Sequence, residues 1–470
     1  MSASLPPLQE NATADLAAFA SALTFEQIPP AVVERAKLCL LDGIGVCLHG
    51  ATLPWTRHVQ DMVRAEGATP VATLFAMRHK GSWSQAALAN ATAGHAFEMD
   101  DIHTESVTHP NSLTTPIAIG FAEANPGVTG RDLITAIVAG CEVGTRVGNA
   151  ATTALFLNGF HPQGTSGTFI AAATAGRLLK LDAPAMQNAL GIGGSMSAGL
   201  MAAQEGAMVK RLHAGRAAQS GVYAAELASR GFTGIADIVE AGYGGFLSAY
   251  ARTPDISRIT AGLGTTWETL RIGFKLYPNV TSIHSALDAL HHIMTTHGLG
   301  ADDIRAIDVG CGHMTFVHTA WTYRDAGVTA AQMNMFYGLA AMATGGEVTA
   351  ADYTSSRMRD PRLLDFIPRI TIREDAALEA MGRHFRHACR MTVTTTGGRT
   401  FDHDVLYRRG SADNEVGPDE IRRKFAGNVR GLLSDHDRDR AIYLIQALAT
   451  ADDVRAICDM LANRVHAVDS

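Results

Sequence analysis

The pattern of apolar and polar positions over the first 265 residues predicts one helix after another. Segment 29–51 opens on a proline pair, which favours the first turn of a helix, and its apolar and small side chains recur at helical spacing. Segment 129–150 starts with Thr129, a suitable N-cap, and Asp132 follows three residues later, as in a capping box. Alternating strand patterns are scarce here, so we expect an all-helical region.

The pattern changes near residue 266. Segments 369–375 and 390–405 alternate β-branched with polar side chains, as strands do, and the pair Gly397–Gly398 suits a hairpin turn. Segment 329–349, which precedes them, has helical spacing and a glycine stop. This part of the chain is therefore predicted to mix helices with a sheet.

From about residue 417 the chain becomes helical again, and we expect this tail to return to the first region. The predicted fold is mainly α. It consists of a large all-helical domain formed by residues 1–265 and 415–470, and a smaller α+β domain formed by residues 266–414.

Composition and charge narrow the class of protein. With 47% hydrophobic and 18% charged residues among 470, the chain can bury a large core, which excludes a disordered or fibrous protein. The formal net charge of −7 gives no reason to expect a nucleic-acid partner. An acidic small-molecule substrate would need a local cationic pocket.

Cysteine usage and the N-terminus point to the cytoplasm. The six cysteines are scattered without a CxxC pair, which favours reduced structural thiols and gives no support for a zinc or iron–sulfur site. The first residues lack a basic stretch followed by an apolar one. The longest apolar runs end within about a dozen residues, short of the roughly 20 needed for a membrane span. We expect a cytoplasmic protein with no membrane partner.

Residues 94–112 concentrate histidines and acids in one short segment. They include His95, His103, His109 and four carboxylates. A solvated loop is one interpretation, but His109 and Pro110 abut an apolar helix, which favours burial. A metal site is less favoured, because His103 and His109 lack the i, i+4 spacing of a helical ligand pair and no cysteine helps.

The stretch 158–169 interrupts the helical pattern with His161, a proline and small hydroxylated residues. If a helix begins near residues 164–165, its free N–H groups and the hydroxyls of Thr165 and Ser166 could receive an anion. His161 stands just before it, where it could donate to a carboxylate or move a proton. A capping turn with a packed imidazole is the alternative.

Two further segments place cations among apolar residues. Lys210 lies in segment 207–219, and an inward ammonium there would need an anionic partner, whereas a snorkelling lysine would not. Lys275 and His284 flank a Pro-Asn turn that leads into a helix. Cations and imidazoles at helix starts suit a small polycarboxylate substrate and proton transfer without a metal.

The motifs carrying these residues resemble the MmgE/PrpD family over nearly the whole chain. They are "HAFEMDDIHTESVTHP", "GFHPQGTSGTFIAAATAGRLLKLD", "ALGIGGSMSAGLM", "MVKRLHAGRAAQSGVYAAELASRGFTG", "FKLYPNVTSIHSALDAL" and "NMFYGLAAMATGGEVT". The family includes 2-methylcitrate dehydratase, cis-aconitate decarboxylase and iminodisuccinate epimerase. The resemblance implies a homodimer whose smaller domain acts as a lid, with an active site in the cleft between the domains and no metal or organic cofactor.

By motif position, the resemblance also implies a set of site residues. The implied catalytic residues are His109, His161, Lys210 and Tyr337, and the implied substrate-binding residues are Asp100, Thr104, Lys275 and His284. One of the two catalytic histidines would act as general acid or base, the lysines would hold carboxylates, and Tyr337 would be a second proton donor. The turns "YPNVTSIH" and "THPNS" depart from the commoner family patterns at positions where substrate side groups could be read.

The predicted function is a metal-free lyase that acts on a citrate-like di- or tricarboxylate. We expect a hydro-lyase similar to 2-methylcitrate dehydratase. The alternatives are a decarboxylase of cis-aconitate, an epimerase or isomerase of an amino- or imino-dicarboxylate, and a non-catalytic carboxylate-binding protein. The residue set permits dehydration, decarboxylation and epimerisation.

Overall fold

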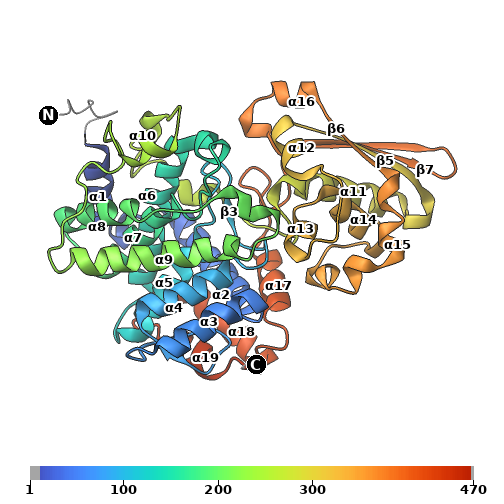
Figure 1. Cartoon of the computed structure of the whole chain (residues 1–470). Helices are drawn as coiled ribbons and strands as arrows, with labels where there is room; N and C mark the ends of the chain where they lie inside the picture. The colour runs from blue at the N-terminus through green and yellow to red at the C-terminus, as the bar shows by residue number, and fades with distance from the viewer. Residues whose placement is uncertain (1–10, 467–470) are drawn as a thin grey trace.

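The computed structural model describes residues 11–466 as two bodies that lie side by side (Figure 1). The larger body contains α1 (Ala12–Ala22), α2 (Pro30–Ala51), α3 (Pro54–Glu66), α4 (Trp83–Gly94), α5 (Asn111–Ala124), α6 (Gly130–Leu157), α7 (Gly167–Leu178), α8 (Ala183–Ser195), α9 (Val209–Ala228), α10 (Phe246–Tyr250), α17 (Pro418–Asn428), α18 (Asp435–Gln446) and α19 (Arg455–Asn463). Two short ladders accompany these helices, β1 (Ala72–Thr73) with β2 (Lys80–Gly81) and β3 (Ile102–His103) with β4 (Ile272–Gly273).

The smaller body combines a four-stranded sheet with helices. Its elements are α11 (His284–His297), β5 (Ile304–Cys311), α12 (His313–Thr319), α13 (Val328–Gln332), α14 (Met335–Gly345), α15 (Pro361–Leu364), β6 (Ile370–Glu374), α16 (Ala376–Ala380), β7 (Cys389–Thr395) and β8 (Thr400–Val405). The predicted fold class, a mainly helical chain with a smaller α+β part, is confirmed.

The capping box predicted at the start of α6 is present, since Thr129 Oγ1 accepts from the Asp132 amide at 3.1 Å and Asp132 Oδ2 accepts from the Thr129 amide at 3.0 Å.

Small residues let the helices of the larger body approach closely. Gly215 of α9 faces α4, where a Cβ atom would lie 2.1 Å from Thr92 Oγ1. This close packing fixes α9, which carries Lys210.

The C-terminal helices return to the larger body, where α17 lies against α2 (Figure 1). Apolar side chains of α17, α18 and α19 share one core with those of α1 to α9. Lys424 of α17 pairs with Asp42 Oδ1 at 2.7 Å and donates to the Met99 carbonyl at 2.6 Å. The tail therefore helps to hold the segment that follows α4.

The sheet of the smaller body has the order β6-β5-β7-β8, parallel between β5 and β6 and antiparallel elsewhere. In β7, Cys389, Met391 and Val393 alternate inward, as the sequence pattern predicts for a half-buried strand. Their core is distinct from the main core of the larger body; it includes α11 and α14 and also takes in Val46 of α2.

Segment 329–349, predicted as one helix, forms the short helix α13 followed by α14. Asn334 breaks the run because its side chain caps α14, accepting from the Tyr337 amide at 2.9 Å. Among residues 11–466, no helix is both long and apolar enough to cross a membrane.

Candidate active site

A pocket opens between the two bodies. The larger body contributes Glu98, Ile102, Val107, His109, Phe156, His161, Met201, Gln204, Lys210 and Lys275, and the smaller body contributes Val280, Thr281, Ser282, Met314, His318, Met333, Arg386 and His387. Gln204 Oε1 and His318 Nε2 bridge the two walls at 2.9 Å. A ligand in this pocket would thus touch both bodies.

The carboxylate of Glu98, which lines the pocket, contacts three cations. Its Oε1 accepts from Lys210 Nζ and, at 2.5 Å, from Arg211 Nη1, and its Oε2 accepts from Lys275 Nζ at 3.1 Å. All four side chains are buried. Burial opposes the charge of Glu98, yet Lys210, Lys275 and Arg211 together hold its pKa well below the ordinary value.

Lys210 is a cation of this cluster that also faces the pocket. Burial lowers the pKa of Lys210 to about 8, against the opposing effect of Glu98. Lys210 and Arg211 are consecutive residues of the first turn of α9, so one helix start supplies two of the cations. Of the two alternatives that the sequence leaves open for Lys210, an inward ion-paired lysine and a snorkelling one, the structure contains the first.

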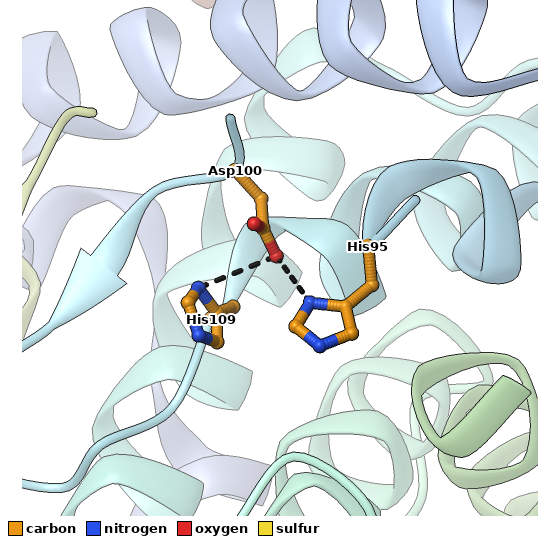
Figure 2. Close-up of side chains that lie close together, drawn as sticks. All are labelled: His95, Asp100 and His109. Carbon is orange, nitrogen blue, oxygen red and sulfur yellow. Dashed lines mark hydrogen bonds and ion pairs between the residues drawn. The ribbon is translucent and has the colours of Figure 1, made fainter. Parts of the chain in front are cut away.

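Asp100 holds two histidines beside this cluster (Figure 2). Its Oδ2 lies 2.7 Å from His95 Nδ1 and 3.3 Å from His109 Nδ1, and its Oδ1 lies 3.6 Å from Lys275 Nζ. These neighbours hold the pKa of Asp100 below its ordinary value in spite of burial. Burial lowers the pKa of His109 to about 3, so its imidazole is neutral at physiological pH.

The hydrogen bond of His109 fixes its tautomer. His109 Nδ1 lies 2.7 Å from the Asp101 carbonyl oxygen, and because a carbonyl only accepts, this nitrogen must carry the hydrogen. The Nε2 atom of the neutral ring is then the acceptor. The ligating atoms of His95, Asp100 and His109 lie within 4.8 Å of one another, but a proton occupies Nδ1 of His109, and Lys275 stands beside the carboxylate. This donor set fits proton handling better than it fits a cation.

His161 lies on the turn that precedes α7 and lines the same pocket as Lys210 and Lys275. Its amide donates to the Gly199 carbonyl at 3.0 Å, and its Nδ1 lies 2.9 Å from Nδ1 of His213. Burial, together with His95 and Lys210, holds the pKa of His161 well below its ordinary value. The helix begins at Gly167 rather than near residue 164, and the Thr165 hydroxyl donates back to the His161 carbonyl at 2.9 Å.

Two residues that line the pocket have left-handed backbone conformations. Glu98 has a φ of 54° and Val107 a φ of 55°. Such values are unfavourable for any residue with a side chain and most of all for a β-branched one. Strain of this kind persists only where the surrounding structure enforces it, and here it aims the Glu98 carboxylate at the three cations.

Comparison with known proteins extends over almost the whole chain. Residues 14–259 match the MmgE/PrpD N-terminal domain, and residues 277–450 match the MmgE/PrpD C-terminal domain.

The chain belongs to the MmgE/PrpD family.

Curated MmgE/PrpD relatives align along most of their own length. The cis-aconitate decarboxylase-like protein oryM of Aspergillus oryzae is 29% identical, with 97% of this chain and 98% of the relative covered. A cis-aconitate decarboxylase of Aspergillus terreus is 28% identical, with 96% of each chain covered. A cis-aconitate decarboxylase of Homo sapiens is 25% identical, with 92% of this chain and 90% of the relative covered.

The structure brings five of the eight residues implied by the MmgE/PrpD resemblance together. His109, His161, Lys210 and Lys275 line the pocket, and Asp100 contacts His109 and Lys275 directly behind its wall. These residues come from three stretches of the larger body and from the segment that enters the smaller one.

Three implied residues lie elsewhere. Tyr337 is fully buried among aromatic rings and its hydroxyl donates to the Asp352 carbonyl, so it does not face the pocket as a proton donor. His284 is buried behind the turn that lines the pocket, where its Nε2 donates to the Asn279 carbonyl at 3.0 Å. Thr104 lines a separate, smaller pocket, and its carbonyl accepts from Arg386.

Several residues that face or support the pocket are not among the eight site residues implied by the resemblance. Glu98, His95 and His213 lie within the sequence segments singled out above, and His213 follows Lys210 by three residues on the same helix face. Arg386, His387 and His318 come from the smaller body. No sequence motif marks these three residues, because only the docking of the two bodies brings them to the pocket.

Proposed function

We propose that this protein is a carboxy-lyase that removes CO₂ from cis-aconitate or a closely similar unsaturated tricarboxylate. The observation that carries the proposal is the pocket itself, which buried cations and neutral imidazoles line together. The relatives named as cis-aconitate decarboxylases, aligned over more than nine-tenths of this chain, support decarboxylation over the hydro-lyase expected from the sequence.

The charges of the pocket suit a substrate with several carboxylates. Lys210, Arg211 and Lys275 outnumber the carboxylates of Glu98 and Asp100 that they contact. Arg386 adds a further cation on the opposite wall. Carboxylates of the substrate are therefore expected to bind Lys210, Lys275 and Arg386, partly in competition with Glu98.

The chemistry requires a proton donor and fixed positive charge. In cis-aconitate the carboxylate on the CH₂ group is allylic, so the electron pair released with CO₂ is delocalised toward the remaining carboxylates. Cations fixed at those carboxylates stabilise this charge as it develops. An imidazole then delivers a proton to the far end of the allylic system. His161 and His109 both line the pocket, and we assign the proton donation to His161 because its Nδ1 has a partner that could supply a proton.

An NMR time course in D₂O tests the proposal. The purified protein is incubated separately with cis-aconitate, 2-methylcitrate, citrate and a chiral amino-dicarboxylate. We expect CO₂ and a new vinylic CH₂ signal from cis-aconitate alone, with one deuterium in the other methylene group of the product. Loss of water from 2-methylcitrate without CO₂ would instead establish a hydro-lyase, and deuterium uptake without net conversion an epimerase.

The variant His161→Ala serves as the activity control. We expect its turnover to fall at least about a hundredfold, as when a proton-transfer group is removed. Near-normal turnover in this variant would remove His161 from the mechanism while leaving the substrate assignment intact.

A further inference from the structure

His161 is paired with a second histidine that does not line the pocket. The Nδ1 atoms of His161 and His213 lie 2.9 Å apart, with the ring centroids 5.1 Å apart. His161 is only 6% exposed and lines the pocket, whereas His213 is partly exposed. The pair therefore connects the pocket wall to the solvent side of α9.

The surroundings of the pair keep it neutral. Lys210, His95 and His109 are the charged or titratable groups that act on His161, and Lys210 and His95 act on His213. In the described part of the chain neither ring bonds a carboxylate. Burial and the nearby cation lower the pKa of both imidazoles, that of His213 to about 4.

Two neutral imidazoles joined Nδ1 to Nδ1 share one hydrogen between them. If the hydrogen belongs to His213, then Nε2 of His161 carries the N–H that can be donated in the pocket. If it belongs to His161, then Nε2 of His213 carries the other N–H. Moving the shared hydrogen from one Nδ1 to the other therefore shifts the second N–H between Nε2 of His161 and Nε2 of His213.

The backbone around His213 is shaped to hold its ring in place. Gly199, with a φ of 144°, lies against the ring, where a Cβ atom would be 3.2 Å from Cγ and from Nδ1. The carbonyl of the same glycine accepts from the His161 amide at 3.0 Å. One glycine therefore positions both members of the pair, and no side chain separates them.

We propose that His213 is a proton relay that resupplies His161 from solvent during turnover. The step rests on the proposed decarboxylation. The C–C bond to the departing carboxylate breaks and its electron pair forms the new C=C bond, while the electron pair of the old C=C bond takes the proton of His161 Nε2. His161 Nδ1 takes the proton of His213 Nδ1, and His213 Nε2 takes one from solvent. After product release, His161 Nε2 gains a proton from water, the shared hydrogen moves back from His161 Nδ1 to His213 Nδ1, and His213 Nε2 releases a proton to solvent, which restores the starting tautomers.

The test compares two asparagine variants. In His213→Asn the side-chain amide can still donate to His161 Nδ1, but it cannot pass a proton on. In the control, His292→Asn, one ring is removed from the stacked pair of His292 and His403 in the smaller body, whose centroids lie 3.9 Å apart. We expect kcat of His213→Asn on cis-aconitate to fall at least about tenfold with KM within twofold, and the control to be unchanged.

Chemical rescue separates a relay from a structural role. Added imidazole should restore a large part of kcat in His213→Asn and leave the wild-type protein unaffected, because a free imidazole can carry the missing proton. Wild-type kcat in His213→Asn would overturn the relay. So would a loss of activity that imidazole does not restore in a variant with unchanged thermal unfolding.

A measurement without substrate keeps this inference separate from the proposed function. With ¹⁵N-labelled histidine, a scalar coupling between the two Nδ1 atoms is expected in the free wild-type protein and absent in His213→Asn. If the coupling is seen but no carboxylate is turned over by the wild-type protein, the proposed function fails while the shared hydrogen stands. If the coupling is absent, the relay is overturned whatever the activity.

Discussion

Glu98 determines how the cations of the pocket are held before a substrate arrives. Its one carboxylate contacts Lys210, Arg211 and Lys275, all of them buried. Cations at this depth are costly without a partner, so the carboxylate is required for stability as well as for the geometry of the pocket. A substrate carboxylate can supply part of the negative charge that Glu98 provides to these cations. Substrate binding therefore depends on the charge state of the site.

The variant Glu98→Gln should therefore be unstable alone and rescued by an anion. Leaving buried cations without their carboxylate is expected to cost about 3–5 kcal/mol of unfolding free energy. Cis-aconitate or citrate should raise the melting temperature of the variant more than that of the wild-type protein. The control Glu415→Gln, which removes an exposed carboxylate paired with Arg35, should change the unfolding free energy by less than about 1 kcal/mol. Equal shifts with ligand in Glu98→Gln and wild type would contradict this role.

At the scale of elements, the sequence predicts which helices bear the site residues better than it predicts the contacts that each side chain makes. Because Lys210 lies in an apolar stretch of α9, the sequence raises an inward lysine there as one of two alternatives. Its partner Glu98 is 112 residues away in the chain, and no local periodicity links the two. Tyr337 shows the opposite case. Its motif position implies the site, yet the packing of α14 within the core of the smaller body turns its hydroxyl to the Asp352 carbonyl.

The same distinction applies to the fold. Strand alternation in β7 and the capping box of α6 are local patterns, so the sequence predicts them correctly. The break between α13 and α14 depends on one side-chain cap by Asn334, which a long apolar helical run conceals. Arg386 and His387 enter the pocket through the docking of two cores, a property that no single segment encodes.

Glycines on two helices give a matched test of how tightly these elements pack. A methyl group on Gly215 of α9 would meet Thr92 Oγ1 at 2.1 Å and the Leu88 carbonyl oxygen at 2.5 Å, so Gly215→Ala is expected to destabilise the protein by about 1–3 kcal/mol. Gly427 of α17 has open space around the same position, and Gly427→Ala should stabilise it by about 0.5–1 kcal/mol. Urea unfolding of both variants measures the difference, and equal effects would show that α9 and α4 can move apart freely.

At the scale of the whole molecule, buried histidines make the fold sensitive to acid. Burial lowers the pKa of His95, His109, His161, His213, His284, His318 and His387. Each binds a proton more readily when unfolded, so the free energy of unfolding falls as the pH drops from about 6.5 through the lowered values. Asp101, whose pKa burial raises to about 8, acts in the opposite direction between about pH 4 and pH 8, but the histidines outnumber it.

We therefore expect the urea midpoint of unfolding to fall steeply between pH 6.5 and pH 4. A bound polycarboxylate should reduce this dependence, because its charge favours protonated imidazoles around the pocket. Measuring the midpoint at half-unit pH steps, with and without citrate, checks both statements. A midpoint that stays constant over this range would mean that the histidines are already charged in the folded protein.

We propose that the homodimer expected from the sequence has a contact that includes the end of α9 and the loop that follows. Tyr223 of α9 and Phe232 and Tyr243 of the loop after it are 41%, 57% and 85% exposed, and exposed apolar side chains of this size favour a covered surface. Sedimentation of the wild-type protein should give the mass of two chains. Replacing Phe232 and Tyr243 together by glutamate should give single chains, since a buried unpaired charge opposes association. The control Tyr443→Glu, on α18 and 67% exposed, should remain a dimer.

A monomeric wild-type protein at micromolar concentration would contradict the contact. If all three proteins sediment as dimers, the contact must lie on another face of the molecule.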